Sequence, residues 1–300
     1  MVSAFLLQPL HMKFPHLTHA QAPLTCEVSA INEFGEHISV SIPAERALTV
    51  YVDKRELVTL MTLGAYPELL VLGYLRNQRL VNSVDEIESI NVDWDVGAAA
   101  VKTRDGIADI EEKTAQRVVT TGCGQGSVFG GLMDEVDQIM LPPDAGITQS
   151  QLYALVNTIR LKETTYKSSG SVHACALFDT ASSLPEMLIF VEDVGRHNAI
   201  DTIAGWMLMN PNKLTESRLV FYTTGRLTSE MVIKSAQMGV PIVVSRSGIT
   251  QMGHQVAQSV GLCAIGRATN KRFVCYSALQ RLVLQAGLAG QPLTSEGLVL

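Results

Sequence analysis

Polar and apolar positions alternate along the first part of the chain in a way that predicts strands. The stretch from Thr25 to Val50 shows this alternation in the segments CEVSAIN and HISVSIPAERALTVYV, and Asp53-Lys54 then offers a turn. The run from Pro67 to Val81 has the spacing of an amphipathic helix that begins with proline. Together with the strand-like runs DEIESINV and AAAVKT, these elements predict a small α+β region over residues 25–116.

The later part of the chain alternates predicted helices with continuous apolar strands. The helix TQSQLYALVNTIRL, capped by Thr148 or Ser150, precedes a hairpin made of SVHACALFD and EMLIFVED. Helices and strands then alternate as far as RFVCYS, which predicts a mostly parallel, covered sheet over residues 148–280. Residues 281–300 are left as a C-terminal tail. The predicted fold class is α/β, with a larger domain following the smaller α+β region.

A glycine-rich segment separates the two regions. VVTTGCGQGSVFGGL, residues 118–132, holds five glycines and Cys123. Glycine has no side chain, and this segment therefore contributes little to a core. We predict a mobile loop and linker over residues 117–147. A cysteine in such a loop is accessible, and accessibility together with thiolate character makes sulfur reactive.

Composition narrows the function classes. The chain has 23 basic and 29 acidic residues and a net charge of −6, and it has no basic run that would predict a nucleic-acid partner. No stretch reaches the roughly 18 apolar residues of a membrane helix, and the first residues lack the features of a signal peptide. The five cysteines are scattered, unlike a disulfide framework, and Cys263 and Cys275 lie in apolar runs typical of inert core thiols. We therefore expect a cytoplasmic protein without a membrane partner.

Three junctions between a predicted strand and the segment after it carry polar or basic residues. VEDVGRHNAIDTI contains His197, YTTGRLTSEM contains Arg226, and GRATNKRF contains Arg267, Lys271 and Arg272. Ligands gather where strands feed helix N-termini, and free N–H groups there favour anions. Each junction alone is also consistent with a capped helix or a solvated turn. The three together favour a ligand that carries phosphate.

Several of these segments resemble a known family. TTGCGQG, GSVHACAL, VEDVGRHNAIDTIAGW, YTTGRLTSEMVIKSAQMGVPIVVSRS and LCAIGRATNKRFVCYS are similar to the formate dehydrogenase accessory sulfurtransferases, FdhD. The resemblance implies a cytoplasmic, homodimeric sulfur carrier whose larger domain has a three-layer fold like that of cytidine deaminases. It implies three partners: a cysteine desulfurase that supplies persulfide sulfur, the bis-molybdopterin guanine dinucleotide cofactor (molybdenum or tungsten) that accepts it, and formate dehydrogenase.

The resemblance also assigns roles to residues. Cys123 matches the cysteine on which the family carries the persulfide. Residues matching the family's cofactor-binding segment are expected to bind the guanine dinucleotide, with Arg226 and His197 as secondary candidates; that segment consists of Arg267, Ala268, Thr269, Asn270, Lys271 and Arg272. No tightly bound metal is expected, because no Cys-x-x-Cys or His/Cys pair supplies ligands.

The sequence departs from the family pattern at one position. The family commonly has Cys-Gly-x-Cys in the loop, whereas Gly126 stands here in place of the second cysteine. A single thiol is chemically sufficient, because an acceptor can attack the outer sulfur of a persulfide and leave the Cys123 thiolate behind. Any step that needs a neighbouring thiol in the loop is put in doubt.

Two other functions remain open from the sequence. A non-catalytic chaperone would bind the cofactor or the dehydrogenase without moving sulfur. A zinc-dependent nucleobase deaminase would share the fold, and VHAC begins like its His-x-Glu signature. However, Cys175 stands where the deaminase needs glutamate, and no Pro-Cys-x-x-Cys follows.

Overall fold

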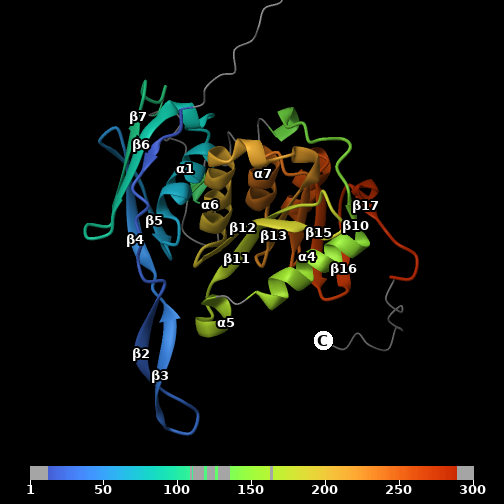
Figure 1. The fold of residues 1–300 in the computed structure, drawn as a ribbon, viewed down its shortest axis with the longest axis horizontal. Helices are drawn as coiled ribbons and strands as arrows, with labels where there is room; N and C mark the ends of the chain where they lie inside the picture. The colour runs from blue at the N-terminus through green and yellow to red at the C-terminus, as the bar shows by residue number, and fades with distance from the viewer. Residues whose placement is uncertain are drawn as a thin grey trace, which may run out of the picture.

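The computed structural model describes residues 13–108, 110, 118–119, 126–127, 136–162 and 165–288. Cys123 lies outside these residues, so the predicted mobility of residues 122–131 and the accessibility of the Cys123 sulfur stay predictions. Two large mixed sheets with hydrophobic clusters packed against them dominate the described part of the chain (Figure 1). Among the described residues, no helix has the length and apolar character needed to cross a membrane.

The N-terminal unit is a five-stranded sheet in the order β1-β6-β7-β4-β5, with one face covered by helix α1 (Pro67–Asn77). In β4 every second side chain from Leu48 to Val52 is buried, and the Asp53-Lys54 turn that joins β4 to β5 has φ of 47° and 73°. Two positive φ values define the type I′ turn that suits a two-residue hairpin. The predicted strands that correspond to β4, β6 and β7, the turn and the helix are confirmed, although the helix ends at Asn77 and not at Val81. Strands β1 and β5 were not predicted. The strands are β1 (His16–Leu17), β4 (Arg46–Val52), β5 (Arg55–Thr62), β6 (Ile87–Asp93) and β7 (Ala98–Thr103).

A two-stranded hairpin, the β2–β3 arm, projects from the N-terminal unit (Figure 1). It pairs β2 (Thr25–Ile31) with β3 (His37–Pro43) in antiparallel register. The opposed pairs Cys26↔Ile42, Val28↔Val40 and Ala30↔Ile38 put apolar side chains on one face, because residues two apart in a strand share a face. In the described chain, none of the three hydrophobic clusters includes a residue of this arm.

The larger unit is built on a six-stranded sheet in the order β12-β11-β13-β14-β15-β16. Only the β13–β14 and β14–β15 pairs are parallel, so the prediction of a mostly parallel sheet is wrong. The short links between β11 and β12 and between β15 and β16 impose antiparallel pairing, since a parallel pair needs a long crossover. The strands are β11 (His173–Asp179), β12 (Glu186–Asp193), β13 (Leu219–Thr223), β14 (Ile242–Ser245), β15 (Cys263–Thr269) and β16 (Arg272–Cys275).

Helices cover both faces of the six-stranded sheet. Helices α6 (Arg196–Met209), α7 (Ser229–Gln237) and α8 (Gln251–Ser259) pack on one face, and α4 (Gln149–Leu161) packs on the other. Thr148 caps α4 through a capping box with Gln151, as one of the two predicted caps. The predicted fold class, a three-layer α/β unit with a smaller α+β region, is confirmed.

Short elements complete the described chain. β8 (Val118–Val119) pairs with β9 (Gly126–Ser127), so Val119 and Gly126 stand opposite each other on either side of Cys123 in the sequence. β10 (Ile147–Thr148) runs parallel to β17 (Leu282–Val283), which places the start of the predicted tail in the folded body. The others are α5 (Thr165–Ser169), η1 (Val84–Glu86), η2 (Val136–Gln138), η3 (Pro211–Lys213), η4 (Glu216–Arg218) and η5 (Leu279–Arg281).

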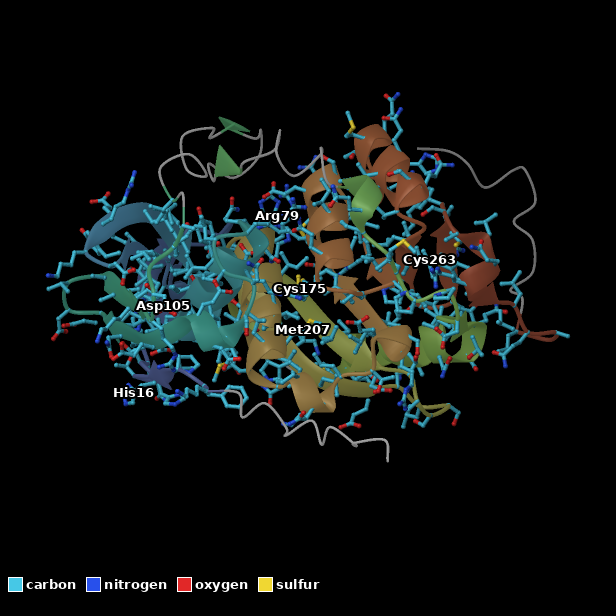
Figure 2. The ribbon with its side chains drawn as sticks, turned by 90° about the horizontal axis from the view of Figure 1, so that it is seen from above. His16, Arg79, Asp105, Cys175, Met207 and Cys263 are labelled. Carbon is cyan, nitrogen blue, oxygen red and sulfur yellow. The ribbon has the colours of Figure 1, made fainter. Side chains whose placement is uncertain are left out.

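The two units are joined by backbone contact between α1 and α6 (Figure 2). A Cβ atom added at Gly73 of α1 would lie 1.6 Å from the Asp201 carbonyl oxygen of α6. A Cβ atom at Gly205 of α6 would lie 2.0 Å from the Leu69 carbonyl oxygen of α1. No side chain fits between helices this close, so both positions require glycine.

We predict that Gly205→Ala lowers the free energy of unfolding by about 3 kcal/mol or more, because the added methyl group meets backbone that cannot rotate away. Gly248→Ala is the matched control, since a Cβ there meets nothing within 4 Å. Urea denaturation followed by circular dichroism measures both. Equal stability of the two variants would contradict the close approach of the helices.

Candidate functional site

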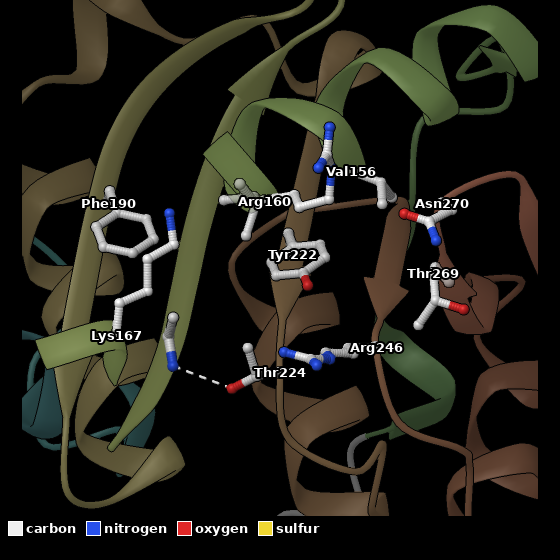
Figure 3. Close-up of a pocket in the computed structure, with 12 residues that line it drawn as sticks. Val156, Arg160, Lys167, Phe190, Tyr222, Thr224, Arg246, Thr269 and Asn270 are labelled. Atoms are coloured by element: carbon white, nitrogen blue, oxygen red, sulfur yellow. Dashed lines mark hydrogen bonds between the residues drawn. The ribbon is translucent and has the colours of Figure 1, made fainter. Parts of the chain in front are cut away.

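A cavity of about 300 Å³ opens at the carboxyl ends of β13, β14 and β15, on the face of the sheet that carries α4 (Figure 3). Among the described residues, three cationic side chains line it, those of Arg160, Lys167 and Arg246, and no acidic one does. In an acidic chain this is a local basic site that suits an anion. The remaining lining residues are Val156, Ile159, Ala174, Phe190, Tyr222, Thr224, Ala268, Thr269 and Asn270.

Polar groups inside the cavity are fixed by the strands. The Ala174 amide donates to Thr224 Oγ1 at 3.0 Å, which ties the residue after β13 to β11 (Figure 3). Burial raises the pKa of Tyr222 to about 12, although Arg246 acts in the opposite direction. The Tyr222 hydroxyl is therefore neutral at physiological pH and can donate a hydrogen bond to a ligand. The cavity can bind an anion and orient it, but no cysteine is among the described side chains that line it.

The structure divides the predicted cofactor-binding segment. Ala268, Thr269 and Asn270 line the cavity, whereas Arg267, Lys271 and Arg272 are exposed and do not line it. The division follows from the backbone, because Arg267 and Asn270 adopt positive φ of 53° and 51° where the β15–β16 register shifts. The cations that line the cavity are thus not those that the sequence singled out.

Sequence reasoning missed Arg160, Lys167 and Arg246. Arg246 directly follows β14, so it stands at a strand end in the same way as Arg226 after β13. The strand-end argument applied to PIVVSRS would have found it. Arg160 and Lys167 lie on α4 and α5, and only tertiary packing brings those helices to the strand ends.

The secondary candidates Arg226 and His197 do not line this cavity. Arg226 is exposed at the junction between β13 and α7. His197 is 5% exposed in the first turn of α6, and its Nδ1 lies 3.4 Å from Glu230 Oε2 of α7. These helices cover the opposite face of the sheet. The three predicted junctions therefore do not converge on one cavity among the described residues.

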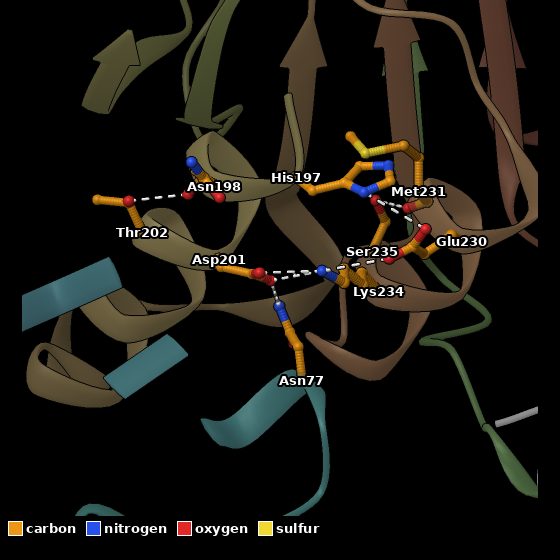
Figure 4. Close-up of polar contacts among 9 residues, drawn as sticks. All are labelled: Asn77, His197, Asn198, Asp201, Thr202, Glu230, Met231, Lys234 and Ser235. Carbon is orange, nitrogen blue, oxygen red and sulfur yellow. Dashed lines mark hydrogen bonds and ion pairs between the residues drawn. The ribbon is translucent and has the colours of Figure 1, made fainter. Parts of the chain in front are cut away.

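The polar residues around His197 belong to a buried network that joins three helices (Figure 4). Lys234 Nζ of α7 lies 2.9 Å from both carboxylate oxygens of Asp201 in α6. Asn77 of α1 donates to Asp201 Oδ1 at 2.7 Å, and Lys234 also lies 3.6 Å from Glu230 Oε1. Breaking such a buried pair leaves an uncompensated charge and typically costs about 3–5 kcal/mol.

Burial and charge shift the protonation of this network. Burial raises the pKa of Asp201 to about 6, against the opposing influence of Lys234 and of hydrogen bonds from Asn77 and Lys234. Burial alone would lower the pKa of Lys234, but Asp201 and Glu230 outweigh it and raise that pKa. Burial and then the charge of Lys234 lower the pKa of His197 to about 3. His197 is therefore a neutral, structural histidine at physiological pH.

The described cysteines differ sharply in their surroundings. Cys175 is fully buried on β11, and burial raises the pKa of its thiol to about 12 despite a hydrogen bond with Thr223. Cys263 is buried, and its sulfur lies 3.7 Å from that of the half-buried Cys275. Cys26 is exposed on the β2–β3 arm. A thiol such as Cys175 can serve neither as a nucleophile nor as the proton shuttle of a deaminase.

The described ranges contain no group of three or more His, Cys, Asp or Glu side chains arranged to hold a metal ion. His173 and Cys175, which begin like a deaminase signature in the sequence, both lie on strand β11.

The fold and the cavity define a three-layer α/β protein with a basic site at the ends of its sheet strands. Residues 43–283 match the model of the FdhD/NarQ family, and the chain belongs to that family.

Similar proteins include two that are named sulfur carrier protein FdhD. That of Bacillus subtilis (strain 168) is 31% identical over 244 residues, covering 79% of this chain and 88% of the relative. That of Listeria monocytogenes serotype 4b (strain F2365) is 26% identical over 249 residues, covering 82% and 93%. The crystal structure of a proposed formate dehydrogenase accessory protein from Desulfotalea psychrophila has the same fold, with a TM-score of 0.68 and 22% identity over 87% of this chain and all of that one.

The lowered pKa of His197 predicts a pH dependence of stability. The unfolded chain binds a proton at this residue near pH 6.5, whereas the folded chain does so only near pH 3. Stability from keeping His197 neutral is therefore fully present above pH 6.5 and is lost as the pH falls toward 3. Relative to His197→Gln, the wild type should lose about 2 kcal/mol of unfolding free energy between roughly pH 6.5 and 4.5.

Urea titrations of both proteins across this range measure the difference. The comparison with the variant is needed because the raised pKa of Asp201 acts in the opposite sense between about pH 4 and 6. Parallel stability curves would show that His197 takes up its proton at the same pH in the folded and the unfolded protein, which would contradict the lowered pKa.

Proposed function

We propose that this protein is a sulfur carrier that acts through a persulfide on Cys123. It takes sulfur from a cysteine desulfurase and passes it to the bis-molybdopterin guanine dinucleotide cofactor, which formate dehydrogenase requires. The observation that carries the proposal is membership of the FdhD/NarQ family over residues 43–283, a segment that includes Cys123. The names of the similar proteins and the basic cavity support it.

The other cysteines support the choice of Cys123 by elimination. Cys175 and Cys263 are buried, and Cys275 is half-buried against the sulfur of Cys263. Cys26 is exposed, but it lies before the segment that matches the family. A persulfide carrier needs a thiol that two different partners can reach, and none of these four combines accessibility with a place in the family segment.

Sulfur transfer by one thiol needs two displacements. The Cys123 thiolate attacks the outer sulfur of the desulfurase persulfide, which forms the new S–S bond and releases the desulfurase thiolate. The acceptor then attacks the outer sulfur on Cys123 with its own electron pair, and the Cys123 thiolate leaves with the electrons of the broken bond. No second cysteine takes part, which agrees with glycine at position 126.

The basic cavity supports the acceptor side of the proposal. Its three cations suit the diphosphate of a guanine nucleotide, and Arg246 can form charge-assisted hydrogen bonds with phosphate oxygens. A volume of about 300 Å³ is at the lower end of ligand pockets, so the cavity would hold a nucleotide end of the cofactor rather than all of it. The molybdenum or tungsten ion belongs to the acceptor and not to this chain.

Cys123→Ser should abolish maturation of formate dehydrogenase and leave the fold and nucleotide binding intact, because serine keeps the size and polarity of the side chain but cannot hold sulfane sulfur. Mass spectrometry after incubation with a desulfurase and cysteine should find added sulfur on Cys123 of the wild type. Cys26→Ser and Cys275→Ser are controls that should keep activity, and Gly126→Cys should be tolerated without being required.

Active formate dehydrogenase in cells that carry Cys123→Ser would overturn the carrier mechanism. In that case the non-catalytic chaperone, which binds the cofactor without moving sulfur, becomes the better account.

Arg246→Met should weaken binding of GDP by tenfold or more, since a charged hydrogen bond contributes about 1.5–3 kcal/mol. Arg267→Ala combined with Arg272→Ala should weaken binding less, and mainly at low salt, because both side chains are exposed. Isothermal titration calorimetry at two salt concentrations measures these effects. Arg104→Met, exposed on the N-terminal unit, is the control. If Arg246→Met leaves the GDP affinity unchanged and the Arg267→Ala/Arg272→Ala variant lowers it, the nucleotide binds at the β15–β16 turn and not in the cavity.

A further inference from the structure

Two adjoining cavities lie at the carboxyl-terminal ends of α1 and α7, away from the basic cavity under α4. The larger, of about 470 Å³, is lined by Arg76 and Arg79 together with Gln237, Met238 and Gly239. The smaller, of about 270 Å³, shares Arg76 with the larger. Figure 2 shows Arg79 where α1 meets the helices of the larger unit.

The Arg76 guanidinium is only partly satisfied. Its Nη2 lies 3.5 Å from the Gln237 carbonyl oxygen, at the limit of a hydrogen bond, and its buried Nη1 has no acceptor among the described residues. Burial lowers the pKa of Arg76, and only the charge of Glu216 opposes this. A desolvated guanidinium without a full set of acceptors is unfavourable, so an acceptor from a ligand would stabilise it.

Arg79 is a second, fixed cation in the larger cavity. With its amide turned to satisfy both groups, the Gln237 side-chain oxygen accepts from Arg79 Nη2 at 2.8 Å and from Nε at 3.0 Å. Arg79 adopts a φ of 56° just after the C-terminal end of α1. The cavity wall therefore holds two guanidinium groups contributed by the end of one helix.

The charge balance selects a monoanion. Among the described residues that line the two cavities, Arg76 and Arg79 are the cations and Glu216 is the one carboxylate, which leaves one net positive charge. Both helices end here, and helix C-termini carry partial negative charge that disfavours a dianion such as phosphate. A carboxylate neutralises the remaining charge and matches the guanidinium fork.

The smaller cavity adds an apolar wall next to Arg76. It is lined by Val84, Met207, Leu208, Pro211, Leu214 and Met238. A ligand that places its carboxylate at Arg76 therefore has aliphatic surface beside it for a short chain.

We propose that these joined cavities bind a small monocarboxylate that carries a short aliphatic chain, with Arg76 and Arg79 holding the carboxylate. The two cavities share no described lining residue with the basic cavity, and the proposal does not depend on sulfur transfer or on nucleotide binding. Its ligand differs from a guanine nucleotide in charge and in its aliphatic character.

Methionine labelled with ¹³C at its methyl group supplies the measurement, because Met207 and Met238 line the site. Titration of the full chain with hexanoate should shift both methyl signals in a saturable way. Acetate should bind more than tenfold more weakly, since it lacks the chain and each buried methylene contributes several-fold in affinity. Hexylammonium, which reverses the charge, should not bind.

Arg76→Met should weaken hexanoate binding by tenfold or more, and Arg160→Met, in the basic cavity, should leave it unchanged. The comparison of hexanoate, acetate and hexylammonium uses the wild-type protein, so it tests the proposal even if Arg76→Met does not fold. Unshifted Met207 and Met238 signals, or equal binding of hexanoate and hexylammonium, would overturn the proposal. GDP binding measured in the same samples reports separately on the basic cavity.

Discussion

The contact between α1 and α6 at Gly73 and Gly205 is the constraint on which the arrangement of the two units depends. Because the helix backbones touch, the polar groups of both helices come close enough to bond directly. Asn77 of α1 can then reach Asp201 of α6, which in turn holds Lys234 of α7. Wider spacing of the helices would leave Asp201 and Lys234 in an interior without enough partners, where isolated charges are costly. The buried charges of Asp201 and Lys234 therefore depend on glycine at positions 73 and 205.

A second polar tie holds the units together at the start of α6. The Asp193 carboxylate, 3% exposed at the end of β12, accepts from the Thr62 hydroxyl and, at 3.1 Å, from the Leu63 amide of the N-terminal unit. It also accepts from Asn198 Nδ2 at 2.8 Å. The VEDVGRHN segment, which the sequence suggested as a ligand site, therefore has a structural role. Asp193 and Asn198 of this segment hold the two units together, because Asn198 Nδ2 also donates to the Met61 carbonyl oxygen at 2.6 Å.

The spacing of apolar residues predicted most of the helices and strands, because an element that buries one face places its apolar residues at a regular interval in the sequence. The sequence predicted the antiparallel β11–β12 hairpin from the turn between its strands, but not the antiparallel pairing of β11 with β13, because β11 is as continuously apolar as a parallel strand would be. The site was predicted only in part for a related reason. Ala268, Thr269 and Asn270 were found through the resemblance to the family's cofactor-binding segment. Arg160 and Lys167, by contrast, reach the cavity only through the packing of α4 and α5. The burial of His197 was equally hidden, since its partner Glu230 belongs to another helix.

The β2–β3 arm has a consequence for how this sequence can vary. The FdhD/NarQ match begins at Pro43, where the arm ends, and none of the described hydrophobic clusters draws on the arm. Phe34, at its tip, is 79% exposed, so replacing it alters no packed interior. Selection for a stable fold therefore bears weakly on the arm, and mutations can accumulate there while both cores are preserved. Relatives that share the two sheets and their cores need not share the arm, and the arm sequence can therefore differ from one relative to the next.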